Sequence, residues 1–141
     1  MSNGIPLTDQ DRLPWLLAIN KYMKGLSKEG KSGVVTCSAL KKVYRDVLVN
    51  GCSSEDPIPD ILFVLLHGDR AVIQGRLNSR FGHFLPPSLL DSQLATLEIP
   101  TIDEKCIQVD IKVPPAEIVD QIRENKSLAL IIILPFIMWI L

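Results

Sequence analysis

Apolar residues follow two different spacings along this chain, and the two spacings alternate. Continuous or alternating apolar runs, typical of strands, occupy residues 33–37, 61–66 and 106–113. Apolar positions three and four apart, typical of amphipathic helices, begin near residues 9, 38, 69, 86 and 114. Strands separated by helices indicate an α/β fold, a three-layer parallel sheet with flanking helices and right-handed crossovers.

Short polar residues predict where the helices begin and end. Thr8 or Asp9 is expected to cap the first helix, Ser38 the second and Asp69 the third, because their side chains can accept hydrogen bonds from free backbone N–H groups. Gly51 follows Asn50 as a stop signal for the second helix. The second helix therefore follows directly on the first predicted strand.

The amino-acid composition limits which binding partners and which cellular compartment can be expected for this protein. The chain has 141 residues, 47% of them hydrophobic, and a net charge of −1, which suits one domain and argues against nucleic acid or an anionic membrane as partner. The cysteines Cys37, Cys52 and Cys106 show no paired ligand spacing. Cys37 and Cys106 lie in predicted strands and are expected to be core thiols without a metal, in a cytoplasmic protein whose start has no secretory pattern.

The last segment, residues 128–141, is apolar and carries no charge. A membrane-spanning helix needs about 20 apolar residues, so a membrane anchor is not favoured. The other interpretations are an additional buried element or a segment foreign to the domain. Exposed to water, such a segment would promote aggregation.

Four polar or cationic residues follow the first predicted strand: Ser38, Lys41, Lys42 and Arg45. Ligands of open parallel sheets bind at the carboxyl ends of strands. Lys supplies a point charge and Arg a bidentate fork for carboxylate or phosphate. The cluster therefore predicts an anionic small molecule, while the alternative is the solvated face of an ordinary helix.

A second basic pair, Arg76 and Arg80, is four positions apart on the third predicted helix. Two like charges at this spacing repel each other, but a polyanion bound by both would turn their electrostatic contribution from unfavourable to favourable. With Gly82 and two prolines as hinges, residues 76–90 are predicted to form a lid over phosphates, with His83 near the substrate. The alternative is a pair of solvated arginines and a histidine that only packs in a loop.

Four stretches in order resemble the gluconokinases, P-loop kinases related in fold to shikimate and adenylate kinases. They are residues 4–17 (GIPLTDQDRLPWLL), 37–46 (CSALKKVYRD), 75–84 (GRLNSRFGHF) and 90–98 (LDSQLATLE). The resemblance implies ATP- and Mg²⁺-dependent phosphorylation of D-gluconate at its 6-hydroxyl. It places Arg12, Lys41, Lys42, Arg45 and His83 at gluconate, and Arg76 and Arg80 at the ATP phosphates.

The chain departs from that family at both ends. It contains no Gly-x-x-Gly-x-Gly-Lys-Ser loop, since Gly30-Lys31-Ser32 precedes a strand rather than a helix. We expect the family's first strand, loop and helix to be missing, which would leave an unpaired edge inside the sheet. Residues 1–126 are thus interpreted as an incomplete kinase domain and 127–141 as an atypical tail. Without that loop we expect the chain to be inactive on its own; the alternative function is a non-catalytic truncated form that acts as a binding or dimerisation module, and a homodimer is left open.

Overall fold

A computed structural model of the chain describes residues 7–51, 58–79, 87–125 and 130–134. The elements in chain order are α1 (Asp9–Lys28), β1 (Gly33–Thr36), α2 (Lys42–Asn50), β2 (Ile61–His67), α3 (Arg70–Asn78), α4 (Pro87–Thr96), β3 (Cys106–Asp110), α5 (Pro115–Glu124) and β4 (Leu130–Leu134). The strands form a parallel sheet of order β1-β4-β2-β3. The three strands expected from the sequence are confirmed, although β3 ends earlier than predicted.

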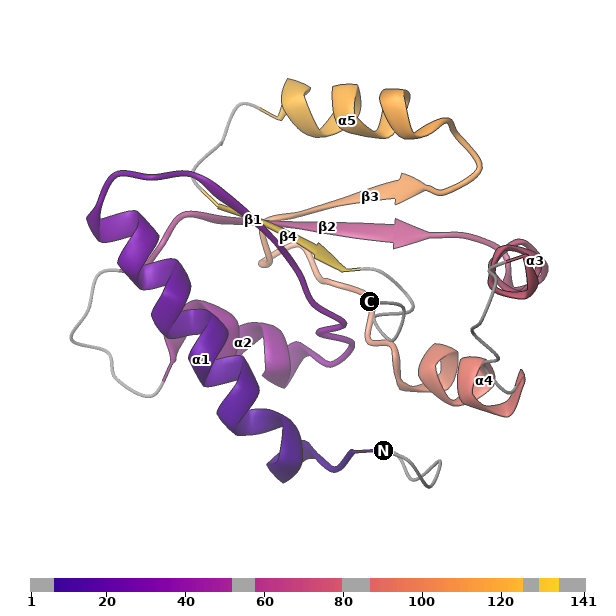
Figure 1. Ribbon diagram of the computed structural model, residues 1–141, viewed down its shortest axis with the longest axis horizontal. Coiled ribbons are helices and arrows are strands. Elements are labelled where there is room, and N and C mark those ends of the chain that lie inside the picture. Colours follow the sequence, from indigo (N-terminus) through magenta and orange to yellow (C-terminus); the bar gives the residue numbers. More distant parts are fainter. Residues whose placement is uncertain (1–6, 52–57, 80–86, 126–129, 135–141) are drawn as a thin grey trace.

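Helices cover both faces of this sheet, which confirms the three-layer α/β fold. α5 lies over one face, α1 and α2 over the other, and α3 and α4 lie at the end toward which β2 and β3 point (Figure 1). Alternate side chains of β2 serve both layers: Phe63 and Leu65 are buried with α1 and α2, and Leu62 and Val64 are buried on the α5 side. A continuous apolar run suits a strand that is buried on both faces.

The apolar tail supplies the strand at the centre of the sheet. Ile132 of β4 lies opposite Val35 of β1 on one side and Phe63 of β2 on the other. Ile132 is fully buried in the α1–α2 core, and Ile131 packs with the α5 cluster. The expectation of an unpaired edge inside the sheet was therefore wrong, because β4 pairs with both β1 and β2. Among the described residues, no helix is long and apolar enough to cross a membrane.

Two of the predicted caps differ in outcome. Thr8 caps α1 in a capping box with Asp11, as the sequence predicted. The expected Ser38 cap was wrong, because α2 begins only at Lys42 and its N-cap side chain makes no capping bond. Instead, the backbone N–H of Lys42 donates to Glu98 Oε2 at 2.6 Å. A carboxylate distant in sequence thus satisfies a donor that local sequence leaves free.

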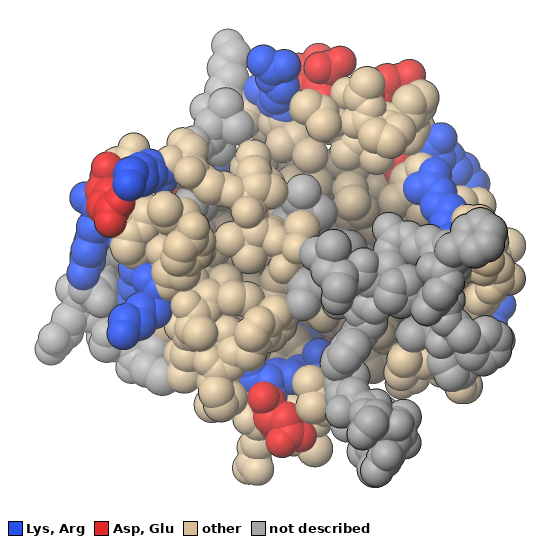
Figure 2. All heavy atoms as spheres, in the orientation of Figure 1, with Lys and Arg blue, Asp and Glu red and all other residues tan. Residues whose placement is uncertain are grey.

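The charges are unevenly distributed over the surface. Figure 2 shows the molecule in the orientation of Figure 1, with a largely uncharged centre and with Lys, Arg, Asp and Glu toward the rim of the described surface. On the face in view, the charged side chains of the described residues thus lie away from its centre.

Candidate functional site

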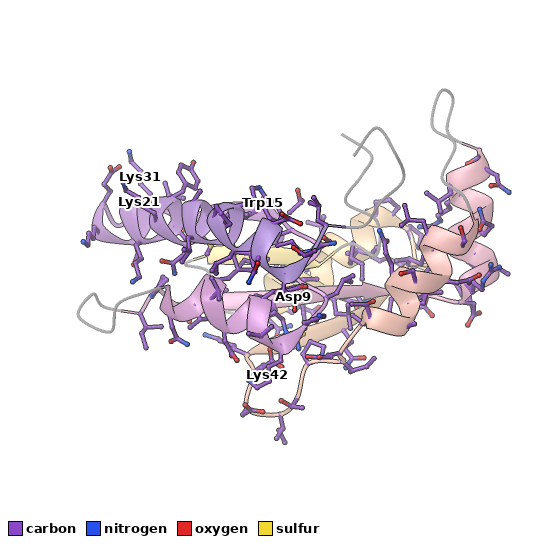
Figure 3. All side chains as sticks on the ribbon, turned by 90° about the horizontal axis from the view of Figure 1, so that it is seen from below. Asp9, Trp15, Lys21, Lys31 and Lys42 are labelled. Atoms are coloured by element: carbon purple, nitrogen blue, oxygen red, sulfur yellow. The ribbon has the colours of Figure 1, made fainter. Side chains whose placement is uncertain are left out.

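α1 and α2 pack side by side, and polar contacts hold them in register at both ends. At one end Asn20 Nδ2 donates to the Leu48 carbonyl oxygen at 2.7 Å, in a buried position. At the other end the Tyr44 hydroxyl donates to Asp9 Oδ1. Figure 3 shows Asp9 where the start of α1 faces α2. The first turns of both helices are thereby brought to one place.

Helical spacing puts two polar residues on each of these turns. Asp9 and Arg12 are three positions apart on α1, and Lys41 and Tyr44 are three apart at the start of α2. Lys41 Nζ contacts Asp9 Oδ1 at 2.9 Å and Oδ2 at 3.0 Å. Arg12 Cζ lies 5.8 Å and Lys41 Nζ 5.6 Å from the centroid of the Tyr44 ring. Two cations therefore flank one aromatic ring.

These contacts shift the pKa values of three side chains in the group, Asp9, Lys41 and Tyr44, away from neutrality. The hydrogen bond from Tyr44, followed by that from Lys41, lowers the pKa of Asp9. The hydrogen bond to Asp9 raises the pKa of Lys41. Burial, followed by the hydrogen bond to Asp9, raises the pKa of Tyr44. At neutral pH the group holds a carboxylate, an ammonium, a guanidinium and a neutral phenol, with one surplus positive charge.

A cavity of about 170 Å³ opens at this group, between α1, α2 and α4. It is lined by Leu7, Asp9, Arg12, Leu40, Lys41, Tyr44, Leu89, Ser92, Gln93 and Thr96. Drug-sized pockets measure roughly 300–1,000 Å³, so this cavity suits a smaller molecule. Its cations lie on α1 and α2, whereas α4 contributes uncharged polar groups. The arrangement is suited to a small anion that also carries hydroxyl groups.

The other predicted cations on α2 lie on its opposite side. Arg45 Nε and Nη2 donate to Glu104 Oε2 at 2.5 Å and Oε1 at 3.0 Å. Arg45 Nη1 donates to the carbonyl oxygens of Ala39 and Leu40. With the Arg45 side chain 1% exposed and that of Glu104 6% exposed, this pair is part of the core. Arg45 therefore ties α2 to the loop before β3 instead of reaching the cavity.

Lys42 also faces away from α1, as Figure 3 shows. Its Nζ pairs with Asp46 at 3.2 Å and Asp103 at 3.4 Å. It lines a second cavity of about 350 Å³, bounded by α2, the start of β2 and residues 103–105. In this second cavity the basic groups are matched by carboxylates, including an Asp60–Lys105 pair. Lys42 and Arg45 thus lie apart from the predicted substrate residues Arg12 and Lys41.

The predicted lid residues have mixed outcomes. Arg76 Nη2 donates to the Ile111 carbonyl oxygen at 2.5 Å, and Arg76 does not line the α1–α2–α4 cavity. Arg80 and His83 lie outside the described residues. In the described part of the chain, no group of three or more His, Cys, Asp or Glu residues could hold a metal ion. Lys31, in the Gly-Lys-Ser triplet before β1, pairs with Glu29 at 2.7 Å.

Sequence reasoning overlooked several residues that line the cavity. The sequence suggested Asp9 only as a helix cap, and it assigned no site role to Tyr44 or Gln93. The signal available for Gln93 was its place in the stretch 90–98, which carries the family resemblance. The three residues come from helices far apart in sequence, so only the packing of α1, α2 and α4 reveals that they share a cavity.

The chain is similar to several proteins named as gluconokinases. It is 42% identical over 125 residues to the thermosensitive gluconokinase of Escherichia coli K12, covering 88% of this chain and 64% of that protein. It is 41% identical over 132 residues to a probable gluconokinase of Xenopus tropicalis, covering 87% of this chain and 70% of that protein. The chain thus spans about two thirds of the length of these relatives. No protein-family model matches it.

A solved structure agrees with these sequence relatives. The unliganded crystal structure of a sugar kinase from Janibacter sp. HTCC2649 superposes with a TM-score of 0.80 and 44% sequence identity, covering 92% of this chain and 71% of that one. This similarity supports a fold of the P-loop kinase type, as expected from the resemblance. Because a relative above 40% identity is matched over more than two thirds of its length, the chain belongs to the gluconokinase family.

Proposed function

We propose that this chain binds D-gluconate in the cavity between α1, α2 and α4. The proposed reaction is the phosphorylation of the 6-hydroxyl of gluconate by ATP with Mg²⁺, giving 6-phospho-D-gluconate. One observation carries the assignment: Arg12 and Lys41 flank Tyr44 in a small cavity whose opposite wall is polar but uncharged. A sugar acid matches these two parts of the cavity, because it has one carboxylate for the cations and a chain of hydroxyls for the uncharged polar groups.

Each residue of the group has a distinct part in the proposed binding. The guanidinium of Arg12 can hold a carboxylate by two parallel hydrogen bonds, and Lys41 adds a mobile point charge. Asp9 keeps Lys41 near Tyr44 before the ligand arrives, through contacts of 2.9 and 3.0 Å. Because Lys41 has three N–H donors, it can keep its hydrogen bonds to Asp9 and bind the substrate carboxylate at the same time. Asp9 thus orients a cation without neutralising the site.

The nucleotide side of the proposed reaction rests on the family alone. The described residues contain no group of three or more His, Cys, Asp or Glu that could hold a metal ion, and Mg²⁺ in kinases is bound largely through substrate phosphates. They do not form a phosphate loop either, because Gly30-Lys31-Ser32 lies before a strand. Arg76 and Arg80 remain the residues proposed to contact the ATP phosphates, and His83 remains a proposed substrate contact. Lys42 and Arg45 are left out of the proposed binding set.

Two measurements on the purified chain test the proposal. Isothermal titration calorimetry with D-gluconate should show binding that is lost in Arg12→Met, and a coupled assay should follow the formation of 6-phosphogluconate with ATP and Mg²⁺. Binding together with turnover supports the kinase. Binding without turnover supports the non-catalytic binding module. The absence of gluconate binding would overturn both.

A further inference from the structure

The inference concerns Gln93, on the α4 wall of the cavity. In the described part of the chain, two buried side-chain oxygens have no hydrogen-bond partner: Oε1 of Gln74 and Oε1 of Gln93. Gln93 lines the α1–α2–α4 cavity, and Gln74 does not. Buried polar atoms in folded proteins are nearly always satisfied, and this oxygen is both shielded and unpartnered, so a ligand in the cavity can supply its donor only when the amide turns toward the cavity.

The chemistry of this wall differs from that of the wall opposite. Arg12 and Lys41 are donors only, whereas an unpartnered amide oxygen is an acceptor. The neighbouring Thr96 hydroxyl donates to the Ser92 carbonyl oxygen at 2.7 Å, so its hydrogen is used within the helix. A carboxylate cannot donate to Gln93 Oε1, but a sugar hydroxyl can. The oxygen of Gln93 can therefore pair with the hydroxylated part of a sugar acid and not with its carboxylate.

We propose that Gln93 is the specificity-determining residue that reads a hydroxyl of the bound sugar acid, while Arg12 and Lys41 hold its carboxylate. This rests on the proposed binding of gluconate in the same cavity. The last side-chain torsion of Gln is broad, so the amide can turn toward the ligand without moving α4. A site built to pair with a hydroxyl rejects an analogue that lacks it, because the acceptor is then left unpaired.

The test compares two ligands of equal charge and carbon number. D-gluconate carries hydroxyls along its chain and hexanoate carries none, so the ratio of their dissociation constants isolates hydroxyl recognition from carboxylate binding. Calorimetry on the full chain should show that Gln93→Leu raises the dissociation constant of gluconate about tenfold and changes that of hexanoate by less than about twofold. Gln74→Leu removes the other unpartnered amide oxygen, which lies outside this cavity, and should leave both dissociation constants unchanged.

A second variant separates hydroxyl recognition from damage to the fold. Gln93→Glu keeps an acceptor of the same length and adds a negative charge. It should weaken both anions while retaining the preference for gluconate over hexanoate. Equal losses of the two ligands in Gln93→Leu, or no loss of either, would overturn the role of Gln93 although wild-type gluconate binding stands. Failure of the wild-type chain to bind gluconate would overturn the proposed function and this inference together.

Discussion

The two sides of α2 carry similar charges and use them differently. On the side facing α1, the Lys41–Asp9 pair has side chains 31% and 60% exposed. On the far side, the Arg45–Glu104 pair has side chains 1% and 6% exposed. The first pair borders a cavity with a surplus cation, whereas in the second every polar nitrogen of Arg45 is already bonded. A run of cations in a sequence therefore does not identify which of them can bind a ligand.

The physical difference lies in desolvation. A buried arginine must have its charge compensated and its donors filled, so nothing remains for a substrate. A half-exposed lysine has N–H donors in contact with water, and it can exchange that water for a carboxylate at small cost. We expect substitutions on the far side of α2 to change stability, and those on the α1 side to change binding.

The largest effect is expected for Glu104→Gln. It leaves the buried Arg45 guanidinium without a counter-charge, so the free energy of unfolding should fall by about 3 kcal/mol. Urea denaturation followed by circular dichroism measures this loss. Asp103→Asn, next in sequence and exposed, is the matched control and should change little. A loss of equal size in both variants would show that the ion pair does not account for the stability.

The same pair predicts how stability depends on pH. Burial is the largest single influence and by itself would raise the pKa of Glu104, but the hydrogen bonds from Arg45 and Thr101 and the positive charges of Arg45 and Lys42 together outweigh it and hold that pKa below its ordinary value of 4.5. The stabilisation is therefore full above pH 4.5 and is lost as the pH falls through the folded-state pKa. Denaturation curves at a series of pH values should show wild type losing more stability below this pH than Glu104→Gln. Parallel curves would contradict the assignment.

The next effect distinguishes adjacent residues on the two sides of α2. Lys41→Met should weaken gluconate about tenfold or more, because it removes a charge-assisted hydrogen bond to the carboxylate. Lys42→Met makes the same change one residue away, on the side facing Asp46 and Asp103, and should leave the dissociation constant unchanged. Calorimetry of both variants decides the matter. A weaker gluconate affinity in Lys42→Met would place the ligand on the wrong side of α2.

The smallest effect is expected for Tyr44→Phe. The substitution removes the hydroxyl that donates to Asp9 but keeps the ring between Arg12 and Lys41. The free energy of unfolding should fall by about 1 kcal/mol, as for loss of one hydrogen bond. Gluconate affinity should fall only a few-fold, since both cations remain. A loss of affinity as large as that of Lys41→Met would show that the phenol itself contacts the ligand.

Local sequence determined much of this protein. The apolar spacings predicted the helices and three of the strands, Thr8 predicted the start of α1, and four ordered stretches indicated the family. Each of these depends on residues within a few positions of one another, where covalent geometry fixes which side chains are neighbours. Such features need no knowledge of how distant segments pack.

Tertiary structure alone decided the rest. Lys41 and Lys42 are adjacent in sequence, and only the packing of α1 near one and of residues 103–104 near the other makes one a site residue and the other a surface ion pair. The apolar run of β4 indicates burial on both faces, but not that its place is between β1 and β2. Hydrogen bonding between strands depends on which edges are left open, and open edges are a property of the assembled sheet.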